Sequence, residues 1–343
     1  MVWPLVKLLP KHTKFRFVRF ATFAAFISIA LVLGSFASVF SAGFRQSPIA
    51  MYEHAQGSPV EKIGYILSQG FNLGIDFRGG AVMELTAPEP IDLAPIRSGL
   101  VALHLGDIQA QSFNDPRHAT VTYQLLGGDA NSVTTRVQQQ IRTIVPGVQF
   151  GRAEVVSPKV SEELFSGGLI ALGLAIALML VYIWFRFEWQ FGVGAVFALF
   201  HDTILTLGLF SVTRLEFTLT VIAAVLTIIG YSMNDTVVVF DRLRENYSKY
   251  KRMPRPDVID LSTNETLSRT MMTSITAMLA ALALWFFGGE TLEGFAIAMT
   301  FGIVIGTYSS IYVAAPVTLL WAPRREENVS ARGEMRPTSQ TSP

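Results

Sequence analysis

The sequence of 343 residues contains no cysteine and has few charged residues. Without cysteine the chain forms no disulfide, thiolate metal site or cysteine nucleophile, so any domain exported to an oxidising compartment must fold by its core alone. Charged residues make up 15% of the chain and hydrophobic residues 50%, far from the usage of soluble proteins. The formal net charge of +1 gives no support for nucleic-acid binding. This composition predicts a protein of the lipid bilayer.

Several motifs of soluble catalysis are also missing from the sequence. It has no Walker A loop, no Ser/His/Asp arrangement and no dinucleotide-binding fingerprint. We therefore expect neither ATPase nor hydrolase activity, no catalytic residue, no metal and no organic cofactor.

Six apolar runs are long enough to cross about 30 Å of hydrocarbon at about 1.5 Å per helical residue. The predicted transmembrane helices cover residues 20–40, 164–185, 191–212, 217–241, 267–287 and 295–321. Short turns join the second helix to the third, the third to the fourth and the fifth to the sixth, so these neighbours must pack antiparallel. A cleaved signal peptide is the alternative for the first run, whose length exceeds the usual apolar core of such a peptide.

The distribution of Lys and Arg predicts the orientation of the chain. Five lie in the tail 1–19, seven between Arg242 and Arg269 and four in the tail 322–343, whereas the two short turns on the other side hold only Arg214. By the positive-inside rule both termini and the basic loop 242–266 are cytoplasmic. That loop either lies on anionic lipid or serves only to fix the topology. Residues 41–163 are then outside, in the periplasm of a bacterium, and the protein is a multi-pass protein of the inner membrane.

The outside segment has the pattern of an α+β domain. Residues 71–77 alternate between apolar and polar, Gly79–Gly80 accepts positive φ, and 81–87 resumes as a strand, so we expect a β-hairpin containing Gly74, Asp76, Gly79 and Gly80. From Ala81 onward the expected order is strand, helix, strand, strand, helix, strand. This order is that of a ferredoxin-like sandwich, a fold that hosts many functions.

An acidic residue lies deep in the fourth predicted helix. Asn234 and Asp235 follow seventeen uncharged residues. A charged carboxylate at that depth costs on the order of 2.5–3.5 kcal/mol, and such residues usually line an ion or proton path. The alternatives are a helix-packing polar cluster, or a helix end that has slipped into the headgroups, because Arg242 follows within seven residues.

A second ionisable pair, His201–Asp202, lies near the centre of the third predicted helix. Histidine titrates near physiological pH, and burial can raise the pKa of an aspartate toward that range, so the pair could relay protons. Equally, a neutral histidine bonded to a protonated aspartate would serve only to fix the packing.

A basic residue lies inside the fifth predicted helix. Ser262 and Glu265 form a Ser-x-x-Glu capping box that would begin this helix, which places Arg269 about two turns inside it. Arg269 is then a candidate partner for Asp235 and would hold that carboxylate charged. The alternative is an arginine that extends to the headgroups.

Small residues recur every four positions in the sixth predicted helix, at Gly302, Gly306 and Ser310. Such a face allows another helix to approach closely, and Gly168 and Gly173 suggest a similar seam in the second helix. We expect a packing role for these residues, with a substrate groove as the alternative.

Together these motifs resemble the SecF subunits of the bacterial Sec translocase, in the SecD/SecF family of the resistance-nodulation-division superfamily. The matching motifs are GIDFRGG at 74–80, ALFHD at 198–202, GYSMNDTVVVFDR at 230–242, LSRT at 267–270 and GTYSSIY at 306–312. They occur in the family's order from the first helix to the sixth.

The resemblance implies six helices with a periplasmic domain between the first two, completed by a SecD partner. It implies export of unfolded preprotein with the SecYEG channel, the SecA ATPase, YajC and membrane lipids as partners, driven by the proton-motive force. The proton is then the coupling ion. Asp235 and Arg269 match family positions proposed for the proton path; we add Asn234, His201 and Asp202 to it. The alternatives are a proton-driven small-molecule exporter of the same superfamily and a non-transporting assembly factor.

Overall fold

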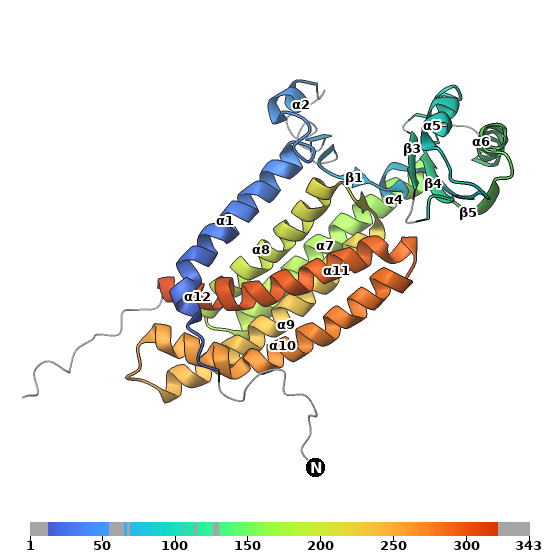
Figure 1. Cartoon of the computed structure of the whole chain (residues 1–343). Helices are drawn as coiled ribbons and strands as arrows, with labels where there is room; N and C mark the ends of the chain where they lie inside the picture. Colours follow the sequence, from blue (N-terminus) through green and yellow to red (C-terminus); the bar gives the residue numbers. More distant parts are fainter. Residues whose placement is uncertain are drawn as a thin grey trace, which may run out of the picture.

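The computed structural model describes residues 13–54, 65–66, 69–106, 108–112, 115–125 and 130–321. Six helical segments in this part of the chain are long and apolar enough to cross a membrane. They are α1 (Phe17–Phe40), α7 (Pro158–Arg186), α8 (Trp189–Thr213), α9 (Leu219–Lys249), α10 (Arg255–Phe287), and α11 (Glu290–Ser309), which continues through a π-helical turn, η1 (Ser310–Ala314), into α12 (Ala315–Trp321). The helices pack side by side, with a small α/β domain at one end (Figure 1). The chain is therefore a polytopic membrane protein.

Helices α8 and α9 form the centre of the bundle. More than half of the apolar stretch of each is buried, whereas α7 and α10 are largely exposed along theirs. The apolar interior joins residues of α8 and α9, such as Leu199 and Phe240, to Ala314 of η1. Residues of α8, α9 and η1 are thus the ones that the fold can hold away from lipid.

The chain's first described residues lie against the start of α10. The backbone N–H of Phe15 donates to Asn264 Oδ1 at 2.9 Å, and that of Val18 to Asp260 Oδ1 at 2.9 Å. The start of α1, the α9–α10 connection and α12 therefore lie at one end of the bundle, and the α/β domain at the other (Figure 1). Residues 1–12 and the tail 322–343 lie outside the described residues.

The expectation of a loop at 242–266 is wrong, because most of that segment is helical. α9 continues to Lys249 and α10 begins at Arg255. Pro256 stands in the first turn of α10, where a missing N–H costs nothing, so it favours a start at this point. The predicted capping box is accordingly wrong: Ser262 is in the helix interior and its hydroxyl donates to the Val258 carbonyl at 2.7 Å.

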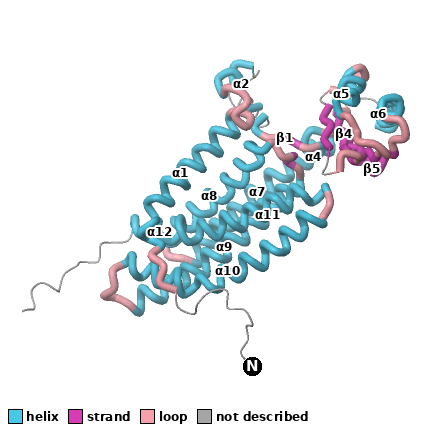
Figure 2. The backbone as a smooth tube through the Cα atoms, in the orientation of Figure 1, coloured by secondary structure: helices cyan, strands magenta, loops and turns pink. Residues whose placement is uncertain are grey.

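The α/β domain contains a four-stranded antiparallel sheet of order β3-β4-β2-β5. Its elements are β2 (Gly80–Thr86), α5 (Leu93–Val101), β3 (Ile108–Ser112), β4 (His118–Tyr123), α6 (Ala130–Ile144) and β5 (Gln149–Val156). The Asp92 carboxylate caps α5 by accepting from the Ala94 N–H at 3.0 Å. Apolar residues of α5 and α6, such as Ile96 and Val137, share one core with the buried face of the sheet. Figure 2 shows these strands at one end of the molecule.

The predicted hairpin at Gly79–Gly80 is wrong. Residues 71–78 form a two-residue strand, β1 (Asn72–Leu73), and a one-turn helix, α4 (Ile75–Arg78). β1 pairs in parallel with β6 (Glu216–Phe217), which lies between α8 and α9. The alternating apolar residues face this turn rather than the sheet, since the Phe71 and Phe77 rings lie 4.9 and 6.0 Å from that of Phe217. A further short helix, α2 (Pro48–His54), follows α1.

Candidate functional site

Asp235 is buried in the bundle and is held by hydroxyl groups from two other elements. Its Oδ1 accepts from Thr270 of α10 at 2.5 Å, and its Oδ2 from Ser310 of η1 at 2.6 Å. No cationic side chain of the described chain forms an ion pair with this carboxylate. Protonation would turn one of these two oxygens from an acceptor into a donor, and so change the hydrogen bond to either Thr270 or Ser310.

Asp202 forms a second buried carboxylate site on α8. Its Oδ1 lies 2.8 Å from Nδ1 of His201, and its Oδ2 accepts from Ser309 of α11 at 2.7 Å. Ser232 of α9 donates a short hydrogen bond to the same Oδ2. His201 and Asp202 are 5% and 1% exposed, so water does not solvate this pair.

The two carboxylates share their neighbouring elements. Ser232 and Asp235 lie three residues apart on α9, and Ser309 and Ser310 are consecutive where α11 passes into η1. π-helical turns occur often at functional sites because they realign successive side chains. Ser309, the last residue of α11, bonds Asp202, and Ser310, the first residue of the π-helical turn, bonds Asp235.

A third polar contact links α9, α10 and α11 next to these two sites. The Tyr231 hydroxyl donates to Ser274 at 3.1 Å, and Ser274 lies 2.7 Å from the Thr307 hydroxyl. Tyr308 reaches α1, where its hydroxyl donates to the Ala24 carbonyl at 2.9 Å. Hydroxyl groups thus connect most of the bundle at the depth of the carboxylates.

Asn234 and Arg269 do not join this buried cluster. Both side chains are exposed, and Arg269 acts on Asp235 through its charge and not through a hydrogen bond. The predicted Asp235–Arg269 ion pair is not formed between these two described residues. Thr270, the next residue, occupies the face of α10 that meets α9. The donor to Asp235 is therefore Thr270, one position after the predicted Arg269. As a result the carboxylate accepts from a neutral hydroxyl instead of a charged guanidinium.

The small residues of the sixth span lie against α9. A Cβ at Gly302 would be 2.4 Å from Ile228 side-chain atoms, and one at Gly306 would be 3.0 Å from Cβ of Ser232. Ser310, the third residue of this face, bonds Asp235 instead of leaving a gap. In α7 a Cβ at Gly168 would lie 2.7 Å from Ile222 Cδ1 of α9, whereas one at Gly173 would meet nothing within 4 Å. Of the two predicted residues, Gly168 therefore packs closely against a neighbouring helix and Gly173 does not.

Gly74 and Asp76 belong to a junction between the α/β domain and the bundle, which we define as residues 69–79 and 214–219. Asp76 Oδ2 accepts from the Leu219 N–H at the start of α9 at 2.8 Å. The Arg214 guanidinium donates to three backbone carbonyls, those of Gln69, Gly70 and Phe71. Gly79 and Gly80 have φ of 71° and 143°, which turn the chain from α4 into β2.

Two charged groups of the junction have shifted pKa values. Burial raises the pKa of Glu216, and the negative charge of Asp76 raises it further. Burial lowers the pKa of Arg214, with repulsion from Arg45 and Arg78 adding to the effect. The junction therefore binds a proton at Glu216 more readily than an exposed glutamate would.

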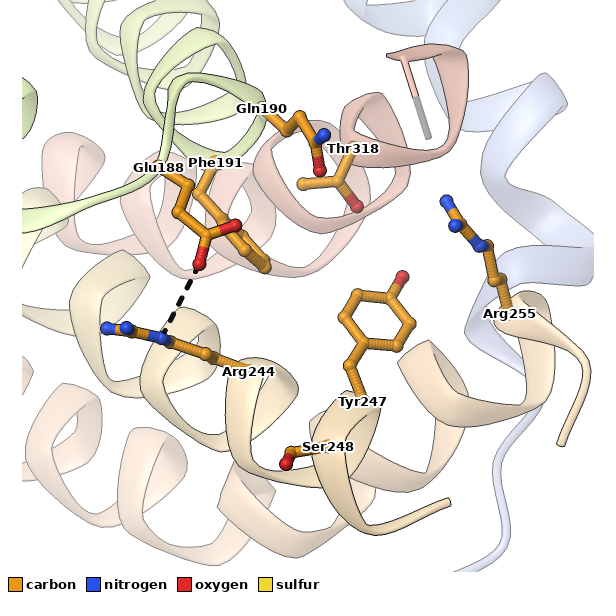
Figure 3. A pocket seen from close by; sticks show the side chains of 8 residues that line it. All are labelled: Glu188, Gln190, Phe191, Arg244, Tyr247, Ser248, Arg255 and Thr318. Carbon is orange, nitrogen blue, oxygen red and sulfur yellow. Dashed lines mark ion pairs between the residues drawn. The ribbon is translucent and has the colours of Figure 1, made fainter. Parts of the chain in front are cut away.

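A cavity of about 400 Å³ lies at the other end of the bundle. Its lining comprises Glu188, Gln190, Phe191, Arg244, Tyr247, Ser248, Arg255 and Thr318. Arg244 and Arg255 lie on opposite sides with the Tyr247 ring between them, and Arg244 Nε is 3.9 Å from Glu188 (Figure 3). Neither Asp202 nor Asp235 lines this cavity. Within the described residues, no group of three or more His, Asp and Glu side chains could hold a metal ion.

Sequence reasoning identified both carboxylates but missed most of their partners. Ser232, Thr270 and Ser309 were not singled out, and Ser310 was assigned only to packing. Their spacing offered a signal: Ser232 precedes Asp235 by three residues, so both lie on one face of the helix.

The chain is similar in sequence to subunits of the bacterial protein export machinery. Residues 64–87 match the SecD/SecF GG motif family, and residues 136–324 match the C-terminal family of the protein export membrane proteins SecD and SecF. The protein translocase subunit SecF of Cereibacter sphaeroides is 46% identical over 262 residues, covering 74% of this chain and 81% of that protein. The SecF subunit of Rickettsia bellii is 38% identical over 334 residues, covering 95% and 99%.

Two solved structures are similar to most of this chain. The crystal structure of SecDF, a translocon-associated membrane protein from Thermus, is 31% identical with a TM-score of 0.75 and matches 92% of this chain. A SecDF structure in the super-membrane-facing form has a TM-score of 0.61 at 31% identity and matches 93%. The chain spans 40% of the length of each SecDF chain.

Proposed function

The chain belongs to the SecF family of protein translocase subunits, and we propose that proton binding at Asp235 drives its contribution to protein export. Export through the Sec translocase is the function of the family as its members are named. The observation that carries the proton step is a buried carboxylate that bonds neutral hydroxyls of two other elements and forms no ion pair within the described part of the chain. Such a group changes charge without breaking an ion pair.

The energies involved are comparable. Moving one charge through 100 mV yields about 2.3 kcal/mol. A hydrogen bond to a charged group contributes about 1.5–3 kcal/mol. One proton can therefore offset the loss of one hydroxyl–carboxylate bond and bias two arrangements of α9 relative to α10 and η1. Transfer of a long polypeptide needs several such cycles.

The proposed orientation follows the basic residues. Both termini and the α9–α10 connection face the cytoplasm, and the α/β domain faces the periplasm, in the inner membrane of a bacterium. The strand order and the two packed helices support a ferredoxin-like domain. SecD is the proposed direct partner, since solved SecDF chains are more than twice as long as this one. SecYEG, SecA, YajC and unfolded preprotein complete the proposed assembly, and no ATPase activity is assigned to this subunit.

The test is Asp235→Asn in inverted membrane vesicles, with export measured in the presence and absence of a proton-motive force. We expect the dependence on that force to disappear, while the variant still copurifies with SecD. Asp257→Asn, an exposed carboxylate on α10, is the matched control and should retain the dependence. An undiminished dependence in Asp235→Asn contradicts the proposal, and loss of the complex would instead favour an assembly factor.

A further inference from the structure

We propose that His201–Asp202 is a second proton-binding centre of this subunit, and that Ser309 and Ser310 couple its proton occupancy to that of Asp235. The inference rests on the proposed function and adds a second centre and the residues that connect the two. No residue of the described chain bonds both carboxylates. The connection is two neighbouring hydroxyls on one helical turn.

His201 has an open position for a proton. Its Nδ1 faces the Asp202 carboxylate, which orients the ring, while Nε2 is buried and has no hydrogen-bond partner in the described chain. An imidazole that donates from Nδ1 carries its acceptor lone pair on Nε2. A proton added there gives an imidazolium next to a carboxylate, so Asp202 stabilises the charged ring. The unpaired buried Nε2 would otherwise be an uncompensated cost.

Both serines have a second acceptor within reach. The Ser309 hydroxyl lies 2.7 Å from Asp202 Oδ2 and 3.2 Å from the Gly306 carbonyl. The Ser310 hydroxyl lies 2.6 Å from Asp235 Oδ2 and 3.0 Å from the Thr307 carbonyl. An ionised carboxylate accepts from the hydroxyl, whereas a protonated one can donate to it and release the hydroxyl to its own helix. Each serine therefore has one arrangement for each protonation state.

The two choices are not independent, because the serines are consecutive. A change at Ser309 alters bonding at the Gly306 carbonyl, and a change at Ser310 alters bonding at the Thr307 carbonyl, in the same helical turn. Ser232 and Asp235 provide a second connection through α9. Two further titratable groups of the described chain act on these centres: the Tyr308 ring lies 6.0 Å from that of His201, and the charge of Arg269 acts on Asp235.

The experiment is a pH titration by infrared difference spectroscopy of the full chain in complex with SecD in lipid. Asp202→Asn and Asp235→Asn assign the carboxyl bands. Ser309→Ala then removes a hydroxyl that contacts Asp202 and not Asp235. We expect the midpoint of the Asp235 band to shift by at least about half a pH unit, a threefold change in proton affinity, in line with couplings between neighbouring groups.

Ser309→Thr, which keeps the hydroxyl, should restore the original midpoint. Thr203→Ala is the control, because this buried hydroxyl of α8 donates to the Leu199 carbonyl and, among the described residues, bonds neither carboxylate. His201→Gln should abolish one titration step near the pair. An Asp235 midpoint that is the same in Ser309→Ala and the unmodified protein overturns the coupling, even if Asp235→Asn abolishes proton-dependent export. A spectrum with no titrating Asp235 band contradicts the proposed function itself.

Discussion

Arg214 offers a direct test of how the α/β domain is fastened to the bundle. Its guanidinium donates to the Gln69, Gly70 and Phe71 carbonyls at 3.0, 2.9 and 3.2 Å. Arg214→Ala removes all three bonds and leaves the left-handed backbone at this position, with φ of 57°, equally strained. Hydrogen bonds to a charged donor contribute about 1.5–3 kcal/mol each, and partial exposure reduces this to about 1 kcal/mol.

The expected loss is therefore about 3 kcal/mol in the free energy of local opening, or about a hundredfold in the opening equilibrium. Hydrogen exchange of the Gly74 amide at the end of β1, which donates to the Phe217 carbonyl at 3.0 Å, measures this quantity, since local opening governs its exchange. Arg214→Lys keeps the charge without the planar fork of donors and should give an intermediate rate.

The control is Arg45→Ala, an exposed arginine whose charge acts on Arg214. Its exchange rate at the Gly74 amide should remain close to that of the unmodified protein. A change of less than about threefold in Arg214→Ala would refute the reasoning, because the three bonds would then contribute almost nothing to docking of the junction.

Two further outcomes follow from the junction and the helix seam. Because burial and Asp76 raise the pKa of Glu216, the closed junction is most stable below the ordinary glutamate pKa and loses stability as pH rises through the raised value. Exchange at the Gly74 amide, corrected for its intrinsic pH dependence, should therefore accelerate with pH in the unmodified protein and not in Glu216→Gln; equal slopes would contradict the assignment. Gly302→Ala places a methyl group 2.4 Å from Ile228 and should cost about 1–3 kcal/mol in thermal unfolding. Gly173→Ala, with open space around it, is the control, and equal losses in the two variants would exclude the seam.

The sequence predicted the helices better than their connections. Uncharged runs located all six spans because lipid tolerates few polar residues over such lengths. The end of α9 and the start of α10 are polar and do not show that pattern. The sequence therefore did not predict that α9 continues to Lys249 or that α10 begins as early as Arg255. The alternation at 71–77 has the period of a strand and so predicted one. Its apolar residues instead pack on Phe217, whose distance in sequence hides this contact from a local pattern.

The carboxylates of the candidate site could be predicted from the sequence, but the hydroxyl groups that donate to them could not. Asp202 and Asp235 stand out because burying a carboxylate in lipid is costly. Serine and threonine do not, since each can bond a carbonyl of its own helix at little cost. Ser310 does both, with Asp235 and Thr307 as its acceptors. Whether a hydroxyl serves its helix or a neighbour depends on helix rotation, which also decided that Thr270 rather than Arg269 meets Asp235.

α9 provides the physical connection between the carboxylates and the α/β domain. Its first N–H, at Leu219, donates to Asp76, and sixteen residues later it carries Asp235, about 24 Å away along the axis. An uninterrupted helix transmits a tilt over that distance more readily than a loop does. Proton binding that loosens α9 from Thr270 and Ser310 would therefore move the N-terminal end of α9. Asp76 caps this end, and Glu216 lies just before it in the sequence. The carboxylate and the junction would then act on the same rigid element, one from each end.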